Sequence, residues 1–476
     1  MRYLNDMQLS QKVLAKFSHS ASHEKKRKAI IGAETIYQGD GSMQSALGKD
    51  YVFIPGKNWR LSLAEIVSFL EYRRISFALS EFAREFIEAN VTGETNIDSL
   101  GGFIKIGAVK AEFSTDLGRR AFVKNERPAK KQIQESIASS DIVARIVSKT
   151  RGKVLFGVSI YSADRSLRGS SNRIHRFVGS TVKDFLTTQG LKSDFMGFSN
   201  RTFPQLTHVE VLKKQLVEKE AEALVCVGRE RTLIATTTGV HNPFEFQKRD
   251  IEKPVERRIF SLPPRLARIL VNLSGCTPGS TFLDPFCGVG TILQEALLSR
   301  AHVVGVDVNP WCVKAARENL EWLTREYSLE EADSTVLQGD ARKLSQRVRN
   351  VDCIATEPDL GPALRHFPTT SYAAKIIAKL EPLYFGFLED AFRMLNPNGR
   401  LVMVTPYFQT RSGEHVATRF AEKAMEVGFT RVFPFKSEFF KNQGEAVKKL
   451  TGMSSLVDVA ERHKVGREIH IFQKLG

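Results

Sequence analysis

One stretch of the sequence combines an acid, two glycines and a hydroxyl at the spacing of a ligand-binding turn. From Thr281 to Thr291 it reads TFLDPFCGVGT. A short apolar run, an acid, a glycine turn and then the helical spacing of residues 292–298 predict a strand, a loop and a helix. Glycine lets the backbone approach a ligand closely, and a helix N-terminus offers unpaired N–H groups. The pattern therefore predicts a small-molecule cradle.

The residues of this turn discriminate between ligand classes. A phosphate-binding P-loop needs a lysine after its last glycine, but Gly290 is followed by Thr291. A dinucleotide fingerprint needs a third glycine, and Leu293 stands in its place. Asp284, ahead of the glycines, would repel a pyrophosphate and attract an ammonium group. We therefore expect a cationic ligand, and the alternative is an ordinary strand-to-helix turn.

The stretch resembles the first motif of class I S-adenosylmethionine-dependent methyltransferases. Their cofactor, S-adenosyl-L-methionine, carries a sulfonium and an α-amino group and so meets the expected charge. The resemblance implies an α/β fold with a Rossmann-like, mixed seven-stranded sheet. The regular alternation of strand and helix patterns after Ala301 agrees with a doubly wound sheet.

Two further acids follow predicted strands. Asp307 ends the run VVGVD, where it could accept hydrogen bonds from both ribose hydroxyls, and Asp340 follows the next strand, where the adenine amino group would lie. Either acid could instead be a helix cap. The presence of acids at three successive strand ends strengthens the interpretation of each one as a cofactor-binding residue. The expected cofactor-binding residues are Asp284, Phe286, Gly288, Gly290, Thr291, Asp307, Val308, Asp340 and Ala341.

The fourth strand of this half, over 351–356, ends at Glu357-Pro358. This place corresponds to the Asp/Asn-Pro-Pro-aromatic motif of enzymes that methylate exocyclic amines, whose nitrogen lone pair is delocalised into the ring. A carboxylate and a proline carbonyl can accept the two N–H groups and turn the lone pair toward the methyl group. Glu357 and Pro358 are therefore the predicted catalytic residues.

The same loop departs from that motif. Asp359 stands where a proline or tyrosine is expected, and Leu360 replaces the usual aromatic residue, so the loop lacks a stacking platform for a flipped base. The departure puts efficiency and base choice in question more than fold. The candidate replacements are Phe367, Tyr372 and Tyr407.

The length, net charge and cysteine content of the chain indicate its number of domains, its partner and its location. A chain of 476 residues suggests two or three domains, and a net charge of +16 indicates an anionic partner. No run of about 18 apolar residues and no signal-peptide pattern is present, which favours nucleic acid over membrane. The five cysteines are scattered, so we expect neither a metal site nor disulfides, and a cytoplasmic location.

The chain before the glycine turn carries a second resemblance. The segments at 156–159 (FGVS), 179–183 (GSTVK), 206–214 (LTHVEVLKK) and 237–241 (TTGVH) resemble, in that order, the THUMP module of RNA-modifying enzymes. Basic residues around them suit a phosphate backbone, although a merely soluble basic surface is the alternative. The expected RNA-binding residues are Arg173, Arg176, Lys183, Lys213 and Lys214.

The next segments sharpen the resemblance. The linker FQKRDIEKP at 246–254 and the run LPPRLARILVNL at 262–273 are similar to the linker and entry helix of THUMP-containing tRNA guanosine N2-methyltransferases, which methylate position 10 of tRNA. The similarity covers about 50–476, including LGGFIKI at 100–106. The expected parts are a mobile basic extension (1–50), an α+β, ferredoxin-like module (51–145), a THUMP-like RNA-binding module (146–245), a linker (246–262) and a class I methyltransferase domain (263–476).

The resemblances thus imply a tRNA methyltransferase that acts on the exocyclic N2 amine of a guanosine, with position 10 as the target in the family. Two alternatives remain open: a tRNA-binding protein with weak or no catalysis, and an amino-methyltransferase acting on ribosomal RNA or DNA. The sequence leaves open which nucleotide is modified, whether one or two methyl groups are added, the oligomeric state and the need for a small activating subunit. It further predicts a helix from Pro382 to Leu395, a strand over 400–406, and a closing antiparallel pair at 429–432 and 469–472.

Overall fold

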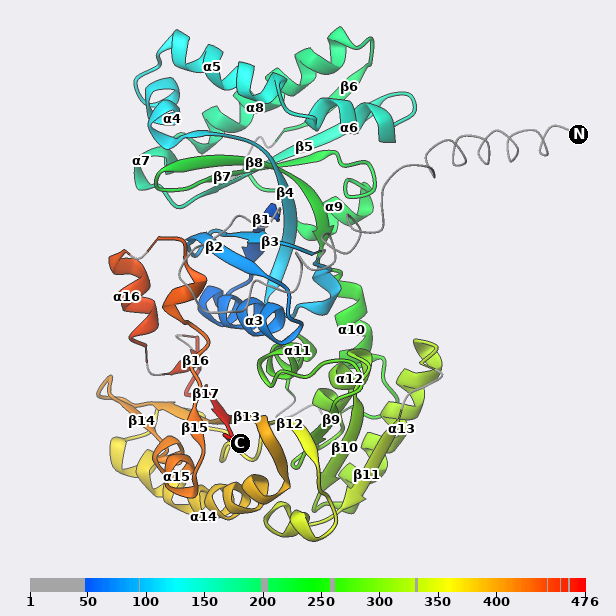
Figure 1. Ribbon diagram of the computed structural model, residues 1–476, viewed down its shortest axis with the longest axis vertical. Helices are drawn as coiled ribbons and strands as arrows, with labels where there is room; N and C mark the ends of the chain where they lie inside the picture. The colour runs from blue at the N-terminus through cyan, green and yellow to red at the C-terminus, as the bar shows by residue number, and fades with distance from the viewer. Residues whose placement is uncertain are drawn as a thin grey trace, which may run out of the picture. The chain divides into compact units, whose positions relative to one another are not determined.

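Two β-sheets organise the described part of the chain (Figure 1). The structure is a computed structural model that describes residues 48–93, 95–197, 204–256, 262–329, 333–442, 444–453, 455–460 and 463–476. The expected extension over 1–50 lies outside these residues except for its last three positions, and residues 257–261 of the expected linker lie outside them as well.

The first sheet has eight strands in the order β2-β3-β1-β4-β8-β7-β5-β6. Strands β4 and β8 pair antiparallel along most of their length, with Val109 opposite Ala235. Because β4 belongs to the expected module 51–145 and β8 to 146–245, the two modules share one continuous sheet. The strands are β1 (Lys49–Pro55), β2 (Phe77–Phe82), β3 (Ile87–Val91), β4 (Phe103–Ser114), β5 (Val154–Ser162), β6 (Ser193–Met196), β7 (Glu222–Val227) and β8 (Arg231–Val240).

The helices of this half are α3 (Trp59–Tyr72), η1 (Ile97–Ser99), α4 (Thr115–Phe122), α5 (Arg127–Ala138), α6 (Ile142–Lys149), α7 (Arg165–Arg168), α8 (Ser171–Thr188) and α9 (His208–Lys213). Helices α4 to α6 pack on the core of the second module, since Ile133 and Ile146 are buried with Val158 and Val178. The segment expected to close the first module therefore covers the second.

The second sheet has a central order β11-β10-β9-β12-β13-β17-β15, with β14 added to β13 and β16 added to β17. Neighbouring strands from β11 to β13 are parallel, and β17 runs antiparallel between β13 and β15. This confirms the predicted Rossmann-like sheet and its closing pair. The strands are β9 (Thr281–Asp284), β10 (His302–Asp307), β11 (Ser334–Gln338), β12 (Val351–Thr356), β13 (Leu395–Gln409), β14 (His415–Ala417), β15 (Thr430–Arg431), β16 (Leu456–Asp458) and β17 (Val465–Gln473).

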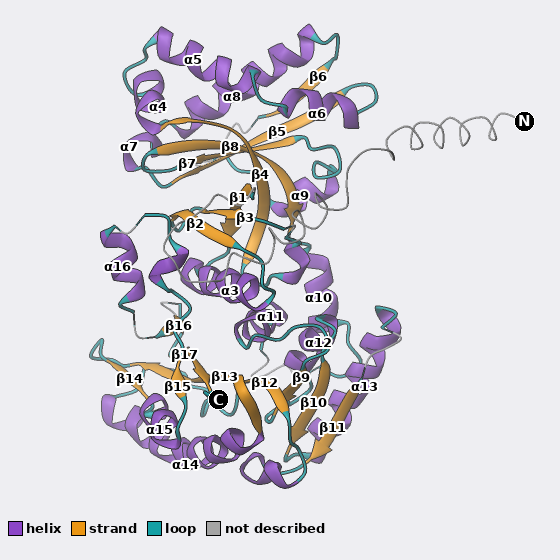
Figure 2. Cartoon of the chain, viewed as in Figure 1, coloured by secondary structure: helices purple, strands orange, loops and turns teal. Residues whose placement is uncertain are grey.

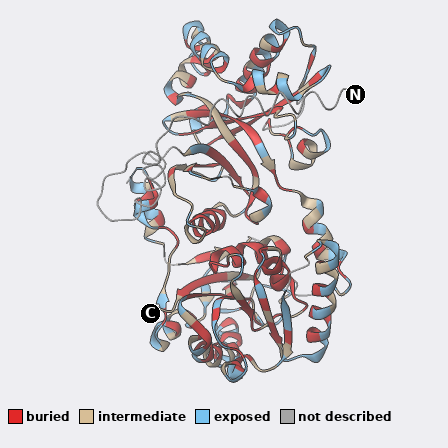
Figure 3. Cartoon of the chain, turned by 45° about the vertical axis from the view of Figure 1, so that its right-hand side comes forward, coloured by how far each residue is buried: buried red, intermediate tan, exposed pale blue. Residues whose placement is uncertain are grey.

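Helices cover both faces of this sheet (Figure 2). Along β12, Cys353 and Ala355 face a core shared with α11 to α13, whereas Ile354 faces a core shared with α14 and α15. The inner strands are buried on both sides, as a doubly wound sheet requires (Figure 3). The helices are α10 (Pro243–Ile251), α11 (Pro264–Leu273), α12 (Thr291–Leu298), α13 (Pro310–Glu326), η2 (Ala341–Gln346), α14 (Thr370–Met394), α15 (Phe420–Val427), η3 (Ser437–Phe439) and α16 (Glu445–Thr451).

Helix α14 differs from its prediction. It begins at Thr370 and not at Pro382, and the proline lies inside it. The Thr369 side chain caps the helix by accepting a hydrogen bond from the Tyr372 backbone N–H at 3.2 Å. Buried Ile376 and Leu380 extend the apolar face ahead of the proline. The predicted start was wrong because burial of this face outweighs the single backbone hydrogen bond that Pro382 removes.

Candidate active site

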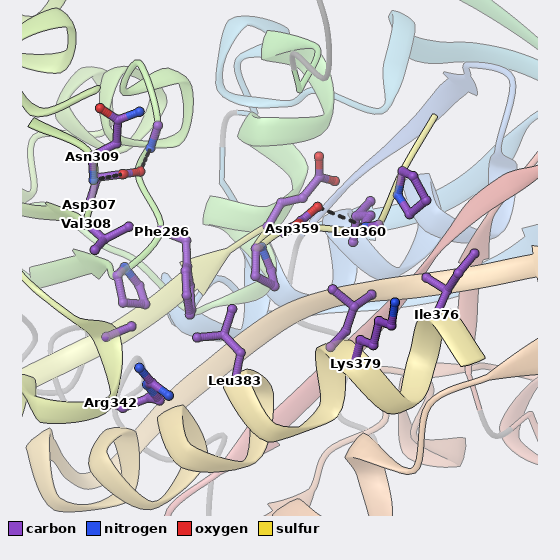
Figure 4. A pocket seen from close by; sticks show the side chains of 18 of the residues that line it. Phe286, Asp307, Val308, Asn309, Arg342, Asp359, Leu360, Ile376, Lys379 and Leu383 are labelled. Carbon is purple, nitrogen blue, oxygen red and sulfur yellow. Dashed lines mark hydrogen bonds between the residues drawn. The ribbon is translucent and has the colours of Figure 1, made fainter. Parts of the chain in front are cut away.

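A cavity of about 1360 Å³ opens at the carboxyl ends of the parallel strands (Figure 4). It lies where the strand order reverses between β9 and β12, the usual position of a ligand site in an open α/β sheet. The loops after β9, β10, β11 and β12 all contribute to its wall, together with one face of α14 and Arg467 of β17. The four predicted strand ends therefore meet at one site.

The glycine turn after β9 presents bare backbone at this cavity. Gly288 has a φ of +51°, and a Cβ added there would meet nothing within 4 Å. Its N–H donates to the Asp307 carboxylate at 2.9 Å, which ties the turn to the end of β10. Gly290 caps α12 at a φ of +87°. Both glycines therefore adopt a left-handed conformation that other residues rarely tolerate.

Asp307 joins two loops at the cavity wall. One carboxylate oxygen accepts the Gly288 N–H, and the other accepts the Asn309 N–H at 2.8 Å. The next residue, Val308, also lines the cavity, and it is 71% exposed although it is apolar. An acid with free lone pairs beside an exposed apolar side chain can bind a sugar that carries a flat, apolar base.

Asp284 lies behind the cavity wall and not in it. It is 1% exposed, and its carboxylate accepts the Thr356 hydroxyl at 2.6 Å and the Phe286 N–H at 3.2 Å. The pKa of Asp284 is raised to about 7, mainly by burial and further by the charges of Asp307 and Glu357, against the opposing effect of its two hydrogen bonds. Burial and the two neighbouring acids therefore both disfavour the ionised form of Asp284.

Asp340 is the N-cap of η2, and it also lines the cavity. Its carboxylate accepts the Arg342 backbone N–H at 3.0 Å and pairs with the Arg342 guanidinium at 2.6 Å. The hydrogen bonds from Arg342 lower the pKa of Asp340 to about 2. Asp340 therefore caps a helix, which was the alternative to cofactor binding, and it also lies at the cavity wall.

Glu357, at the end of β12, is held by an arginine from the far end of the chain. Arg467 of β17 donates from Nε to one carboxylate oxygen at 2.5 Å and from Nη2 to the other at 3.2 Å. Both side chains are largely buried, and both line the cavity with Pro358. Asp359 accepts the Gly361 N–H at 2.9 Å and so closes the loop as a local turn. The Glu357 carboxylate is therefore fixed in orientation.

Most of the predicted site residues share the cavity. Those that line it are Phe286, Gly288, Asp307, Val308, Asp340, Ala341, Glu357 and Pro358. Those outside its wall are Asp284, Gly290 and Thr291. The Thr291 side chain is buried and accepts a hydrogen bond from the Lys253 ammonium at 3.3 Å. These three residues support the turn from behind.

A family model described as a methyltransferase domain, the RMKL-like UPF0020 family, matches residues 256–431. The match contains the glycine turn and the strand ends at Asp307, Asp340 and Glu357. The part of the chain that matches a methyltransferase domain is therefore 256–431, and β17 extends its sheet beyond the match.

The chain is similar over about a third of its length to two curated tRNA-modifying enzymes. The tRNA (guanine(10)-N2)-dimethyltransferase of Methanothermobacter thermautotrophicus is 38% identical over 159 residues, which are 33% of this chain and 43% of that enzyme. The tRNA (guanine(6)-N2)-methyltransferase of Thermus thermophilus is 33% identical over 162 residues, 32% of this chain and 44% of that enzyme. The match thus covers less than half of each relative. The crystal structure of TrmN from Thermus thermophilus aligns over 90% of this chain and 100% of its own, at 17% identity and a TM-score of 0.44.

Two residues of the site escaped the sequence reasoning. Arg467 lies beyond the residues matched as a methyltransferase domain and 110 positions from Glu357, so no local spacing connects them. Thr356 directly precedes Glu357, and a buried hydroxyl at a strand end was the available signal. Its bond to Asp284 becomes visible only once β9 and β12 are known to be neighbours.

The predicted RNA-binding residues lie outside the methyltransferase domain. Arg173, Arg176 and Lys183 are exposed on α8, where their spacing places them on one face. Lys213 ends α9, and Lys214 follows it, both exposed. Their role in RNA binding stays a prediction.

The described residues contain neither a candidate metal-binding cluster nor a membrane-spanning helix. No group of three or more histidine, cysteine, aspartate or glutamate side chains there could hold a metal ion. No helix in the described part is long and apolar enough to cross a membrane. All five cysteines are buried thiols.

Proposed function

We propose that this protein transfers a methyl group from S-adenosyl-L-methionine to the exocyclic N2 amine of a guanosine in tRNA. The observation that carries the proposal is the single cavity in which the glycine turn, Asp307 and Asp340 meet Glu357 and Pro358. The similarity of a third of the chain to enzymes named for tRNA guanine-N2 methylation supports the substrate. Action on tRNA implies a cytoplasmic enzyme.

The chemistry of the site fits this cofactor. The open backbone at Gly288 admits a close ligand, and Asp307 offers acceptors for a ribose. The negative charges of Asp307 and Glu357 help to raise the pKa of Asp284, and a bound cation would lower that pKa again. When bound, S-adenosylmethionine would supply a methyl group activated by its sulfonium charge. Gly288, Asp307 and Asp340 would hold it from the cavity wall, with Asp284 behind them.

Glu357 and Pro358 would bind and orient the amine. The carboxylate and the proline carbonyl are both acceptors, and together they can take the two N–H groups of a planar amine. The nitrogen lone pair then points away from the acceptors, which is the alignment that a direct displacement needs. Arg467 occupies one direction on each Glu357 oxygen and leaves other lone pairs available.

Position 10 is the proposed target, following the name of the Methanothermobacter relative, while the Thermus relative is named for position 6. The first sheet would grip the tRNA through the basic residues of α8 and α9, as its resemblance to THUMP modules suggests. Opening the helical tRNA for the base to reach the cavity costs about a few kcal/mol, which backbone contacts can offset.

Nucleoside mass spectrometry of tRNA, before and after incubation with the full chain and S-adenosylmethionine, tests the proposal. We expect N2-methylguanosine to appear with the wild type and to fall at least 100-fold with Glu357→Gln, because the amide offers one acceptor and two donors. Glu422→Gln, an exposed change on α15, is the control. A product on ribosomal RNA or DNA alone, or tRNA binding without any transfer, would overturn the proposal in favour of one of the two alternatives.

A further inference from the structure

The loop that would hold the target amine offers no aromatic surface. Its cavity-lining side chains after Glu357 are Pro358, Asp359, Leu360 and Pro362. A base that has left its helix loses its stacking partners, and proteins commonly replace them with an aromatic side chain. If a nucleobase enters this cavity, the stacking surface must come from another element.

Helix α14 supplies a suitable face. Tyr372, Lys375 and Lys379 all line the cavity and are all exposed, and the tyrosine side chain is 49% exposed. Their spacing of three and then four residues places them on one side of the helix. In Figure 4, Lys379 and Ile376 project from α14 toward the part of the cavity that holds Leu360.

The loop rests directly on this helix. A Cβ added at Gly361 would come within 2.8 Å of Ile376 and 3.6 Å of Leu380. The Tyr384 hydroxyl donates a hydrogen bond to the Asp359 carbonyl. Since residues four apart are neighbours on a helix, Tyr372 lies one turn from the contact between Ile376 and the loop. Tyr372 therefore lines the same cavity as the predicted amine-binding residues Glu357 and Pro358.

Two other aromatic residues were candidates for the same role, and both are engaged elsewhere. Tyr407 stacks on His415 with ring centroids 4.8 Å apart. Phe367 lies beneath the Lys464 ammonium, 5.9 Å from its ring centroid. Neither belongs to the cavity wall. Tyr372 does, and its ring makes no ring or cation contact within the described residues.

The two lysines of this face have no acidic partner among the described residues, whereas two arginines of the cavity do. Arg342 is paired with Asp340 and Arg467 with Glu357. The ammonium groups of Lys375 and Lys379 take part in no ion pair or hydrogen bond among the described residues. Solvated lysines are common on exposed helices, but these two border a cavity beside an unpartnered tyrosine ring. Together they offer two cations and one stacking surface, the chemistry of a nucleotide subsite.

We infer that this face of α14 binds the target nucleotide, with Tyr372 stacked on the base and Lys375 and Lys379 paired with flanking phosphates. The inference rests on the proposed function and deepens it. It assigns base capture to the helix because the loop lacks an aromatic residue.

Fluorescence of a single-stranded RNA oligonucleotide with one 2-aminopurine tests the inference on the full chain, independently of methyl transfer. We expect the wild type to quench the 2-aminopurine and Tyr372→Phe to do the same. Tyr372→Ala should lose the quenching and bind about 5- to 100-fold more weakly, as expected for one lost base stack. The double variant Lys375→Ala/Lys379→Ala should keep the quenching but lower the salt dependence of binding by about one to two phosphate contacts.

Lys449→Ala on α16, an exposed lysine outside the cavity wall, is the matched control and should change neither quantity. Thermal unfolding of each variant checks that the fold is retained. Wild-type quenching that Tyr372→Ala preserves, or no quenching by the wild type, would overturn the inference. Quenching that depends on Tyr372 together with no methyl transfer to tRNA would support the inference and reject the proposed function alone.

Discussion

Asp284 is the residue whose environment departs most from that of an ordinary carboxylate at this site. Its side chain is buried, and its pKa is raised to about 7, first by burial and then by the charges of Asp307 and Glu357. The group therefore takes up a proton when the chain folds at pH values between about 4 and 7. A buried acid kept in this state costs stability, which is typical of functional sites.

The first prediction follows from the sign of that shift. Because the folded pKa of Asp284 lies above its ordinary value of 3.8, its contribution to stability is largest at low pH and falls as pH rises toward 7. Asp284→Asn removes this dependence. Relative to the wild type, the variant should gain on the order of 2 to 3 kcal/mol in unfolding free energy between pH 5 and pH 8.

Urea unfolding at a series of pH values measures this difference, with Glu422→Gln as the control for an exposed acid. The same carboxyl should couple cofactor binding to protons. A bound cation favours the ionised form, so calorimetry at pH 7 in buffers of different ionisation enthalpy should detect proton release with the wild type and much less with Asp284→Asn. Parallel stability curves for the two proteins would contradict the raised pKa.

The helices and strands determine where these residues lie. Some of their positions could be predicted from the sequence and others could not. Alternation of strand and helix patterns was enough to bring Asp307, Asp340 and Glu357 to one edge, since the carboxyl ends of parallel strands lie together. The pairing of Arg467 with Glu357 was not predictable, because it depends on β17 lying beside β13. Likewise, local patterns do not reveal that β4 and β8 fuse two modules into one sheet.

The start of α14 shows how a strong local signal can mislead. Proline is favoured in the first turn of a helix, so Pro382 looked like a beginning. The buried side chains ahead of it decide otherwise, and the extra turns carry Tyr372, Lys375 and Lys379 to the cavity. An error of twelve residues in one boundary thus hid the face to which we assign nucleotide binding.

The glycine turn leads to a prediction at the scale of the element. Gly288 and Gly413 both have positive φ, +51° and +81°, and an added Cβ at either would meet nothing within 4 Å. Alanine at either position should therefore cost roughly 1 to 2 kcal/mol of stability through backbone strain alone. Only Gly288 lines the cavity. Gly288→Ala should weaken S-adenosylmethionine binding at least tenfold, and Gly413→Ala should not change it.

Calorimetric titration and urea unfolding of the two variants separate these effects. Equal losses of stability with unequal losses of affinity are the expected result. If Gly288→Ala bound the cofactor as well as Gly413→Ala does, the turn would not be a cofactor cradle.

At the scale of the whole molecule, buried polar contacts join the first sheet to the methyltransferase domain. Glu65 of α3 accepts hydrogen bonds from Asn272 of α11 at 2.8 Å and from the backbone N–H groups of Gly101 and Gly102 at 2.7 Å. Arg265 donates to the Gly101 carbonyl at 2.7 Å. Removing one partner from such a buried cluster leaves a polar group without a hydrogen bond, which costs free energy. The cluster therefore stabilises the contact between α3 and α11.

The last prediction concerns how the net charge of +16 is used. If α8 binds a phosphate backbone, the triple variant Arg173→Ala/Arg176→Ala/Lys183→Ala should lose contacts to individual phosphates in addition to three positive charges. Each phosphate contact contributes about 0.7 to 0.9 to the slope of log K against log salt, so the slope for tRNA should fall by about 2 to 3. The affinity for S-adenosylmethionine should stay unchanged. Filter binding of tRNA across a salt series measures the slope.

A matched triple variant separates position from total charge. Lys314, Lys423 and Lys449 lie on α13, α15 and α16, outside the cavity wall, and their replacement by alanine removes the same three charges. Long-range attraction between exposed charges is screened beyond about 10 Å at 0.1 M salt, so this control should leave the slope nearly unchanged. Equal changes of slope in the two triple variants would mean that tRNA responds to the overall charge of the protein, and α8 would then lose its proposed role.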